Sequence, residues 1–192
     1  MMMKVSKYVA QFLVKNGADP KMEEVYEYAL LCLLNELLID FLLLIGAWFI
    51  GAVGEMVLWI IVFNSMRMNI GGFHAMTPTA CSIYSVALGW SSVWLGKHVE
   101  VADVCIETIF MICFWITYKM APLLNPNHPL SEEKKKNARN RGMIFLGLWG
   151  ILSFVLAEIW KTGVSTIVFA VGTSCLLLFL EYVKMNIFLF RE

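Results

Sequence analysis

The chain has 192 residues, of which 59% are hydrophobic and only 16% are charged, and its formal net charge is zero. A soluble domain of this size could not bury so much apolar surface, so the composition argues against an ordinary soluble protein and predicts a chain that faces lipid. The lack of net positive charge argues against a nucleic-acid partner.

Residues 3–15 predict an amphipathic helix near the N-terminus. Apolar side chains such as Val5, Tyr8 and Phe12 recur at helical spacing, and the lysines lie largely opposite them. Such a helix can lie on the membrane surface or pack against cytosolic parts of the same protein, and both readings stay open. The segment lacks the continuous apolar core and the cleavage pattern of a signal peptide.

Longer apolar stretches predict an all-α, polytopic integral membrane protein with about six transmembrane helices. One helical span needs about 20 mostly apolar residues. The stretch from Tyr28 to Met66 is too long for one span and suits two, hinged near residues 51–55, of which the second is short. The expected spans are residues 28–50, 55–68, 78–96, 101–121, 142–160 and 163–183.

Basic residues divide unevenly between the loops that these spans create. With both termini in the cytoplasm, 13 of the 15 lysines and arginines fall inside, and only Lys97 and Lys161 fall outside. This bias follows the positive-inside rule. The expected organisation is a single domain over residues 1–192, with a cytoplasmic or interfacial segment (1–27), a transmembrane bundle (28–183) and a cytoplasmic tail (184–192).

The five cysteines predict neither a disulfide framework nor a zinc site, because their number is odd and no pair is spaced as CxxC. Four of them lie inside apolar runs, where a thiol usually acts as a small hydrophobic group. Cys81 differs because a polar break precedes it.

That break reads RMNIGGFHAMTPTAC, residues 67–81, and it falls on the cytoplasmic side. Gly71 and Gly72 permit a sharp turn that other residues resist. Thr77 followed by proline is typical of a helix start, with the threonine as N-cap. Cys81 then lies in the first turn or so of the third span, where the positive end of the helix favours a thiolate.

His74 lies seven residues before Cys81. On one continuous helix the two would be roughly 10 Å apart along the axis, but the Thr-Pro break allows His74 to fold back. A cysteine with a nearby histidine is the usual arrangement of an activated sulfur nucleophile. The alternative is a solvated loop histidine and a cysteine that only packs.

Other polar residues near the break are candidates for site support or substrate binding. Asn69 is the nearest residue that could orient His74, although a loop or capping role suits it as well. Glu36 and Asp40 share one face of the first span, where carboxylates are costly and generally face a partner or a wet cavity. Arg67 is their candidate partner, so a structural ion pair and a role in the site both stay open.

The break resembles the signature of the accessory gene regulator protein B (AgrB-like) family, which are bacterial membrane cysteine endopeptidases that process autoinducing-peptide precursors. The family pattern is an arginine, a Gly-Gly pair, His-Ala, and a cysteine seven residues after the histidine. The loop APLLNPNHPLSEEKKK, residues 121–136, before the last two spans is also similar to the family. The matching positions of the motif are Arg67, Gly71, Gly72, His74, Ala75 and Cys81.

The resemblance implies a mechanism in which His74 takes the proton of Cys81, whose thiolate attacks a carbonyl of a short AgrD-like precursor peptide. The C-terminal tail leaves, and a cysteine or serine of the precursor attacks the resulting acyl-thioester to close a thiolactone or lactone for quorum sensing. The resemblance implies no cofactor and no metal. It implies a multi-pass protein of the bacterial cell membrane with its active site near the cytoplasmic face, and it leaves a homodimer open.

The run SEEKKK at residues 131–136 predicts a helix start, with Ser131 as cap. Lys134, Lys135 and Lys136 then serve either to set topology or to dock an acidic precursor tail. Two other function classes stay open: a small transporter or channel, since polar residues in spans also mark substrate paths, and a non-catalytic scaffold. Neither the transporter nor the scaffold explains why a helix cap lies beside Cys81.

Overall fold

A computed structural model describes residues 2–73, 77–123 and 131–189. Within these ranges the chain is helical, apart from an isolated β-bridge and irregular connections, which confirms the all-α prediction. Each expected span coincides with one helix, while the number of membrane crossings stays a prediction. The elements are α1 (Met2–Lys15), the 3-10 helix η1 (Pro20–Met22), α2 (Glu23–Phe49), α3 (Val53–Ile70), α4 (Pro78–His98), α5 (Asp103–Met120), α6 (Glu132–Leu156) and α7 (Lys161–Leu189).

Two helices extend well beyond the expected spans. α6 begins at Glu132 rather than near residue 142, because Ser131 caps it by accepting a hydrogen bond from the Lys134 N–H (3.4 Å). α7 continues to Leu189 rather than ending near residue 183. A helix can continue beyond the hydrocarbon core of the membrane, because its backbone hydrogen bonds are internal. Hydropathy therefore indicates where contact with lipid ends and not where the helix ends.

Within the described ranges, two helices are long and apolar enough to cross a membrane, over Pro20–Phe49 and Lys161–Ile187. Their surroundings differ: 11% of the apolar window of the first is buried inside the protein, against 61% for the second. α2 exposes large apolar side chains such as Leu37 and Phe41. Apolar surface of this extent without protein cover fits contact with lipid.

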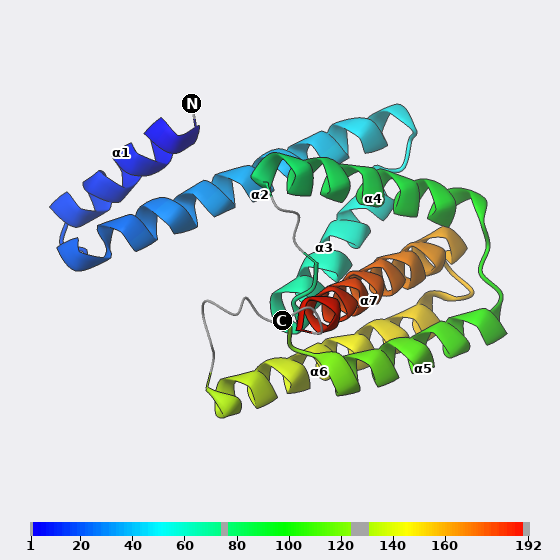
Figure 1. The fold of residues 1–192 in the computed structure, drawn as a ribbon. Helices are drawn as coiled ribbons and strands as arrows, with labels where there is room; N and C mark the ends of the chain where they lie inside the picture. The colour runs from blue at the N-terminus through cyan, green and yellow to red at the C-terminus, as the bar shows by residue number, and fades with distance from the viewer. Residues whose placement is uncertain (1, 74–76, 124–130, 190–192) are drawn as a thin grey trace.

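α7 runs through the middle of the bundle and contacts α3, α4, α5 and α6 (Figure 1). Its side chains Ile167 and Leu178 are fully buried, and they belong to the same core as Met56 and Trp59 of α3. The C-terminal half of α7 lies at the end of the bundle that the distribution of basic residues predicts to be cytoplasmic.

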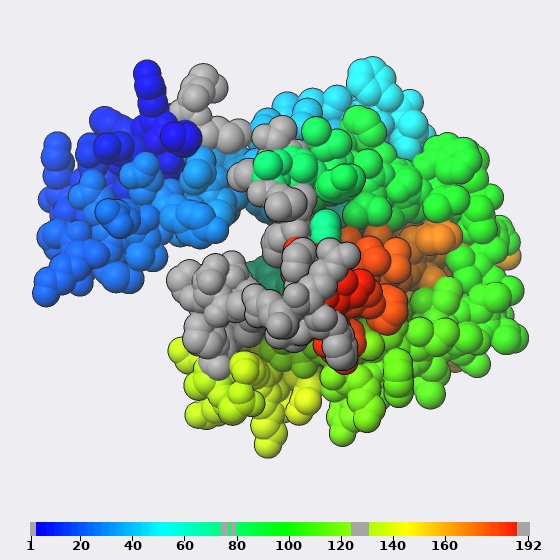
Figure 2. Space-filling model, in the orientation of Figure 1, coloured from blue at the N-terminus to red at the C-terminus, as the bar shows by residue number. Residues whose placement is uncertain are grey.

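α1 and the first half of α2 form a hairpin that stands away from the bundle (Figures 1 and 2). α1 packs against α2, with Ser6 and Ala10 fully buried, while Tyr8 and Phe12 stay 71% and 56% exposed. The predicted amphipathic helix is therefore present with an apolar stripe turned outward. Its place on the membrane surface stays a prediction.

The connections between helices gather at two ends of the bundle. At one end, Lys97 donates a hydrogen bond to the Ile50 carbonyl (2.6 Å), and Thr162 donates one to the Glu55 carboxylate (2.9 Å). These contacts join the connections that the topology puts outside. At the other end, the connections after α3 and α5 meet through a parallel β-bridge. The arrangement is the one that alternating spans require.

Candidate active site

The chain turns sharply directly after α3. Gly71 and Gly72 have φ angles of 75° and 130°, which side-chain-bearing residues rarely adopt. A Cβ on Gly71 would overlap the Leu123 carbonyl oxygen, and one on Gly72 would overlap the Arg67 guanidinium. The Gly-Gly pair is therefore required both by the backbone angles and by the close approach of its neighbours.

Arg67, in the last turn of α3, reaches forward over this turn. Its Nη1 donates to the Gly71 carbonyl (2.9 Å) and its Nη2 donates to the Phe73 carbonyl (3.0 Å). One planar guanidinium thus satisfies two backbone acceptors, which a lysine ammonium could not reach with the same geometry. Arg67 fixes the loop up to the residue before His74.

α7 and the connection after α5 hold the same loop from other sides. The Phe73 N–H donates to the Leu177 carbonyl of α7 (2.9 Å), and the Leu123 N–H donates to the Ile70 carbonyl (3.1 Å). The Lys184 ammonium lies 5.2 Å from the centre of the Phe73 ring. Three separate elements therefore anchor this loop.

Cys81 lies in the first turn of α4, as the sequence predicts. Thr77 is the N-cap, its side chain accepting a hydrogen bond from the Ala80 N–H (3.2 Å), and the helix begins at Pro78. Cys81 is half-buried. Its sulfur therefore lies near the positive end of a helix dipole.

A cavity of about 20 Å³, room for about one water molecule, adjoins Cys81. Arg67 also lines it, and the two residues are close enough to interact electrostatically. A cation beside the sulfur stabilises a thiolate. The other lining residues are Phe63, Phe73, Tyr84, Ser85, Leu88 and Leu177, so the site is largely apolar.

His74 lies outside the described residues, so its predicted contact with Cys81 stays a prediction. Its two flanks are described, however. Phe73, directly before it, shares the cavity with Cys81, and Thr77 is the N-cap of the helix that carries Cys81. The ends of the segment that contains His74 are thus held close to the nucleophile.

The acidic pair of the first span lies next to this arrangement. Glu36 lies near Asn64 and interacts electrostatically with Arg67 and with Asp40. Among the described residues neither carboxylate forms a salt bridge with Arg67, so a structural ion pair and a role in the site both stay predictions. α2 gains a further link to α4 because the Ser82 hydroxyl donates to Asn35 (3.3 Å).

Two other groups of predicted residues lie apart from the cavity. The Asn69 amide donates to the Ser65 carbonyl one turn back in α3 (2.8 Å). Lys134, Lys135 and Lys136 lie in the first turns of α6, where Lys135 pairs with Glu132 (2.8 Å) and this hydrogen bond lowers the pKa of the Glu132 carboxyl.

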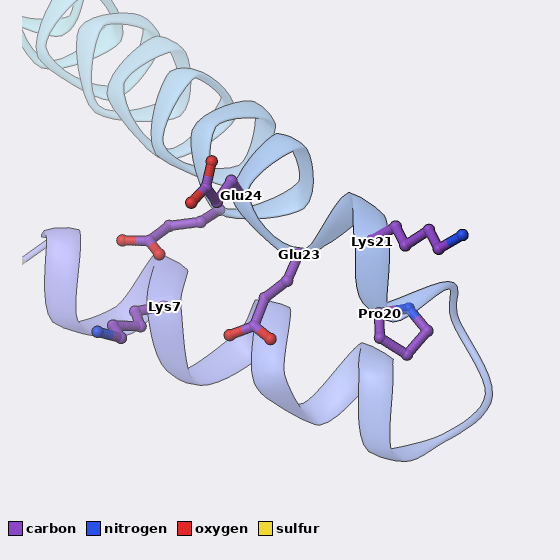
Figure 3. Close-up of a pocket in the computed structure, with 6 residues that line it drawn as sticks. Lys7, Pro20, Lys21, Glu23 and Glu24 are labelled. Carbon is purple, nitrogen blue, oxygen red and sulfur yellow. The ribbon is translucent and has the colours of Figure 1, made fainter.

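A larger hollow, about 370 Å³, lies between α1 and the start of α2 (Figure 3). It shares no lining residue with the Cys81 cavity, and it carries both signs of charge. Its lining residues are Lys7, Pro20, Lys21, Glu23, Glu24 and Glu27.

Sequence reasoning missed several contributors to the site. Ser85 and Leu88 follow Cys81 by one and two helical turns, so helical periodicity could have found them. Leu177, Glu181 and Lys184 come from α7, about 100 residues away, and no local signal marks them. Glu181 interacts electrostatically with Arg67, in addition to the contacts of its helix with the loop.

Comparison with known proteins gives a consistent result. Residues 6–182 match the family model described as accessory gene regulator B. The chain is similar to AgrB-like protein 2 of Clostridium perfringens (strain 13), with 24% identity over 93% of this chain and 91% of that protein. It is also similar to AgrB-like proteins of Clostridium acetobutylicum (22% identity, 65% of this chain, 60% of that protein) and C. perfringens SM101 (26%, 66% and 62%). No solved structure matches the chain.

Proposed function

Because the chain belongs to the accessory gene regulator B family, we propose that it is a membrane-embedded cysteine endopeptidase that cleaves a short AgrD-like precursor peptide. Family membership implies a role in processing quorum-sensing peptides, and together with two long apolar helices it indicates a membrane protein. The observation that carries the finer proposal is Cys81, in the first turn of α4 and beside Arg67 in one cavity.

In the proposed reaction His74 takes the proton of the Cys81 thiol, and the thiolate forms a bond to the carbonyl carbon of the scissile peptide. The C–N bond then breaks, the proton passes from His74 to the leaving amine, and the N-terminal part of the precursor stays on Cys81 as an acyl-thioester. A thiol or hydroxyl of the precursor then gives its proton to His74 and attacks this thioester, which closes a thiolactone or lactone ring and returns the Cys81 thiolate.

The surroundings of Cys81 support this order of steps. Arg67 and the helix N-terminus favour the thiolate that starts the reaction. Phe63, Leu88 and Leu177 keep the cavity small and apolar. A site with little room for water slows hydrolysis of the thioester, so the precursor's own nucleophile can attack first.

Precursor binding is proposed for the cytoplasmic end of the bundle. Lys134 and Lys136 are exposed in the first turns of α6, where they can hold an acidic precursor tail. Setting the membrane topology is the other role that these lysines can have.

A small transporter or channel without peptidase activity is the alternative. Glu36 and Asp40 favour it, because acidic side chains at membrane depth also line substrate paths. The two readings differ at Cys81: a transporter would keep its function after Cys81→Ala, whereas the peptidase would lose it.

The test is co-expression with a short precursor peptide encoded beside this protein, with cleavage followed by mass spectrometry. We expect the parent protein and the matched control Cys105→Ala to cut the precursor, since Cys105 is an exposed cysteine at the start of α5. We expect Cys81→Ala to leave it whole. Equal cleavage by Cys81→Ala and the parent would reject the proposed nucleophile.

A further inference from the structure

Three described contacts converge on Phe73, the residue before His74. Its ring lies under the Lys184 ammonium (5.2 Å), its N–H donates to the Leu177 carbonyl (2.9 Å), and its carbonyl accepts from Arg67 Nη2 (3.0 Å). Lys184 and Leu177 both belong to α7. The last helix therefore holds the side chain and the backbone of this loop residue.

Lys184 is itself held in place by Glu181, one turn earlier on α7. The Lys184 ammonium lies 3.4 Å from the Glu181 carboxylate, and the two side chains are 39% and 20% exposed. Partial burial makes such a pair less screened than a surface ion pair. The pair directs the ammonium toward the Phe73 ring, where a cation is attracted to the ring face.

Further contacts connect Glu181 back to Arg67, on the side of the loop that faces the Cys81 cavity. Glu181 interacts electrostatically with Arg67, and Arg67 holds the Phe73 carbonyl and lines the Cys81 cavity. A change at Lys184 can therefore alter the position of the loop without removing any group from the cavity.

We infer that Glu181 and Lys184 of α7 are positioning residues, which hold Phe73 and thereby set the position of the loop that lines the Cys81 cavity. This inference rests on the proposed function for its effect on catalysis, but the hold on the loop can be measured without any catalysis. A misplacement of about 1 Å in a catalytic group lowers a rate by up to about 100-fold, so the expected effect is on turnover and not on precursor binding.

The first test uses four variants of the full chain in detergent, with initial rates measured on the precursor. Lys184→Met keeps the aliphatic stem and loses the charge, Lys184→Arg keeps a cation over the ring, and Glu181→Gln loses the ion pair. Lys119→Met is the matched control, because Lys119 lies at the same end of the bundle, 6.0 Å from the ring of Tyr118.

We expect kcat to fall about tenfold in Lys184→Met with KM changed less than about twofold, and Lys184→Arg to recover most of the loss. The kcat of Glu181→Gln should lie between those of Lys184→Met and Lys184→Arg, and the kcat of Lys119→Met should equal that of the parent. An unchanged kcat in Lys184→Met would overturn the inference. A raised KM at constant kcat would also overturn it, because it would mean that Lys184 binds the precursor directly.

The second test is amide hydrogen exchange of the peptide that contains Phe73, in the same variants and without precursor. The Phe73 N–H bonded to Leu177 should exchange about tenfold faster in Lys184→Met and at the parent rate in Lys184→Arg and Lys119→Met. Equal exchange in all variants would overturn the inference even if the parent protein cleaved no peptide. Faster exchange in Lys184→Met with an inactive parent would support the hold on the loop and reject the peptidase proposal instead.

Discussion

Arg67 and Phe73 are joined by a hydrogen bond of 3.0 Å, from the Arg67 Nη2 atom to the Phe73 carbonyl oxygen. A second bond, from Nη1 to the Gly71 carbonyl (2.9 Å), uses the same guanidinium. The cation that shares a cavity with Cys81 thus also fixes the loop that leads to His74. Electrostatics and loop geometry depend on one side chain.

Arg67→Lys should therefore behave almost like Arg67→Gln. The lysine keeps a charge but cannot donate to both carbonyls in the same geometry, and a partly buried acceptor that is left unpaired costs up to about 1–3 kcal/mol. We expect precursor cleavage to fall at least about 100-fold in both variants. Alkylation of Cys81 by iodoacetamide at fixed pH should slow most in Arg67→Gln, which lacks the cation. Wild-type cleavage by Arg67→Lys would show that charge alone suffices.

Gly71→Ala should disrupt the turn after α3. The added Cβ meets the Leu123 carbonyl oxygen at a φ of 75°, so the variant should lose about 2 kcal/mol of stability and most of its cleavage. Gly147→Ala is the matched control, because Gly147 lies in α6 with nothing within 4 Å of a Cβ and should gain up to about 1 kcal/mol. Thermal unfolding in detergent measures the stability of each variant, and the cleavage assay measures its activity. Equal stability of the two variants would contradict the described turn.

Thr77→Ala should loosen the start of α4. The Thr77 side chain accepts from the Ala80 N–H, and loss of such a cap costs about 1 kcal/mol. Because Cys81 lies in the same turn, we expect cleavage to fall a few-fold and Thr77→Ser to recover it. The assay is precursor cleavage by the three proteins side by side, and a Thr77→Ser variant as impaired as Thr77→Ala would argue against the cap.

Lys97→Met should destabilise the opposite end of the bundle without changing the chemistry. Lys97 donates to the carbonyls of Ile50 and Gly51 (2.6 and 3.0 Å), where α2 ends. Its loss should cost about 1 kcal/mol. Lys161→Met should cost less, because its pair with Glu100 (3.6 Å) is exposed and such pairs contribute about 0–1 kcal/mol. The measurement is the midpoint of thermal unfolding of each variant. A lower midpoint for Lys161→Met than for Lys97→Met would contradict the described contacts.

Local signals in the sequence predicted the parts of the site that depend on a few neighbouring residues. Thr77 before a proline marked the start of α4, and the Gly-Gly pair marked the turn. These features depend on backbone angles and caps, which short sequences determine. Ser131 likewise marked the start of α6, although hydropathy alone put the span ten residues later.

Parts of the site that depend on packing between distant helices could not be predicted. Leu177 and Lys184 reach the loop only because α7 lies in the centre of the bundle, and no pattern around them indicates that position. A carboxylate at membrane depth requires a partner, and on that ground Arg67 was predicted to pair with Glu36. That reasoning identifies a need for a partner but not its exact contacts.

The most direct measurement of the central claim is the mass of Cys81-containing peptides after reaction with a precursor whose internal cysteine or serine nucleophile is replaced by alanine. Ring closure is then blocked, so the acyl-thioester should accumulate on Cys81 and disappear on treatment with hydroxylamine. The proposed function predicts this adduct in the parent protein and its absence in Cys81→Ala. Release of the precursor tail by Cys81→Ala, or an adduct on a different cysteine, would contradict it.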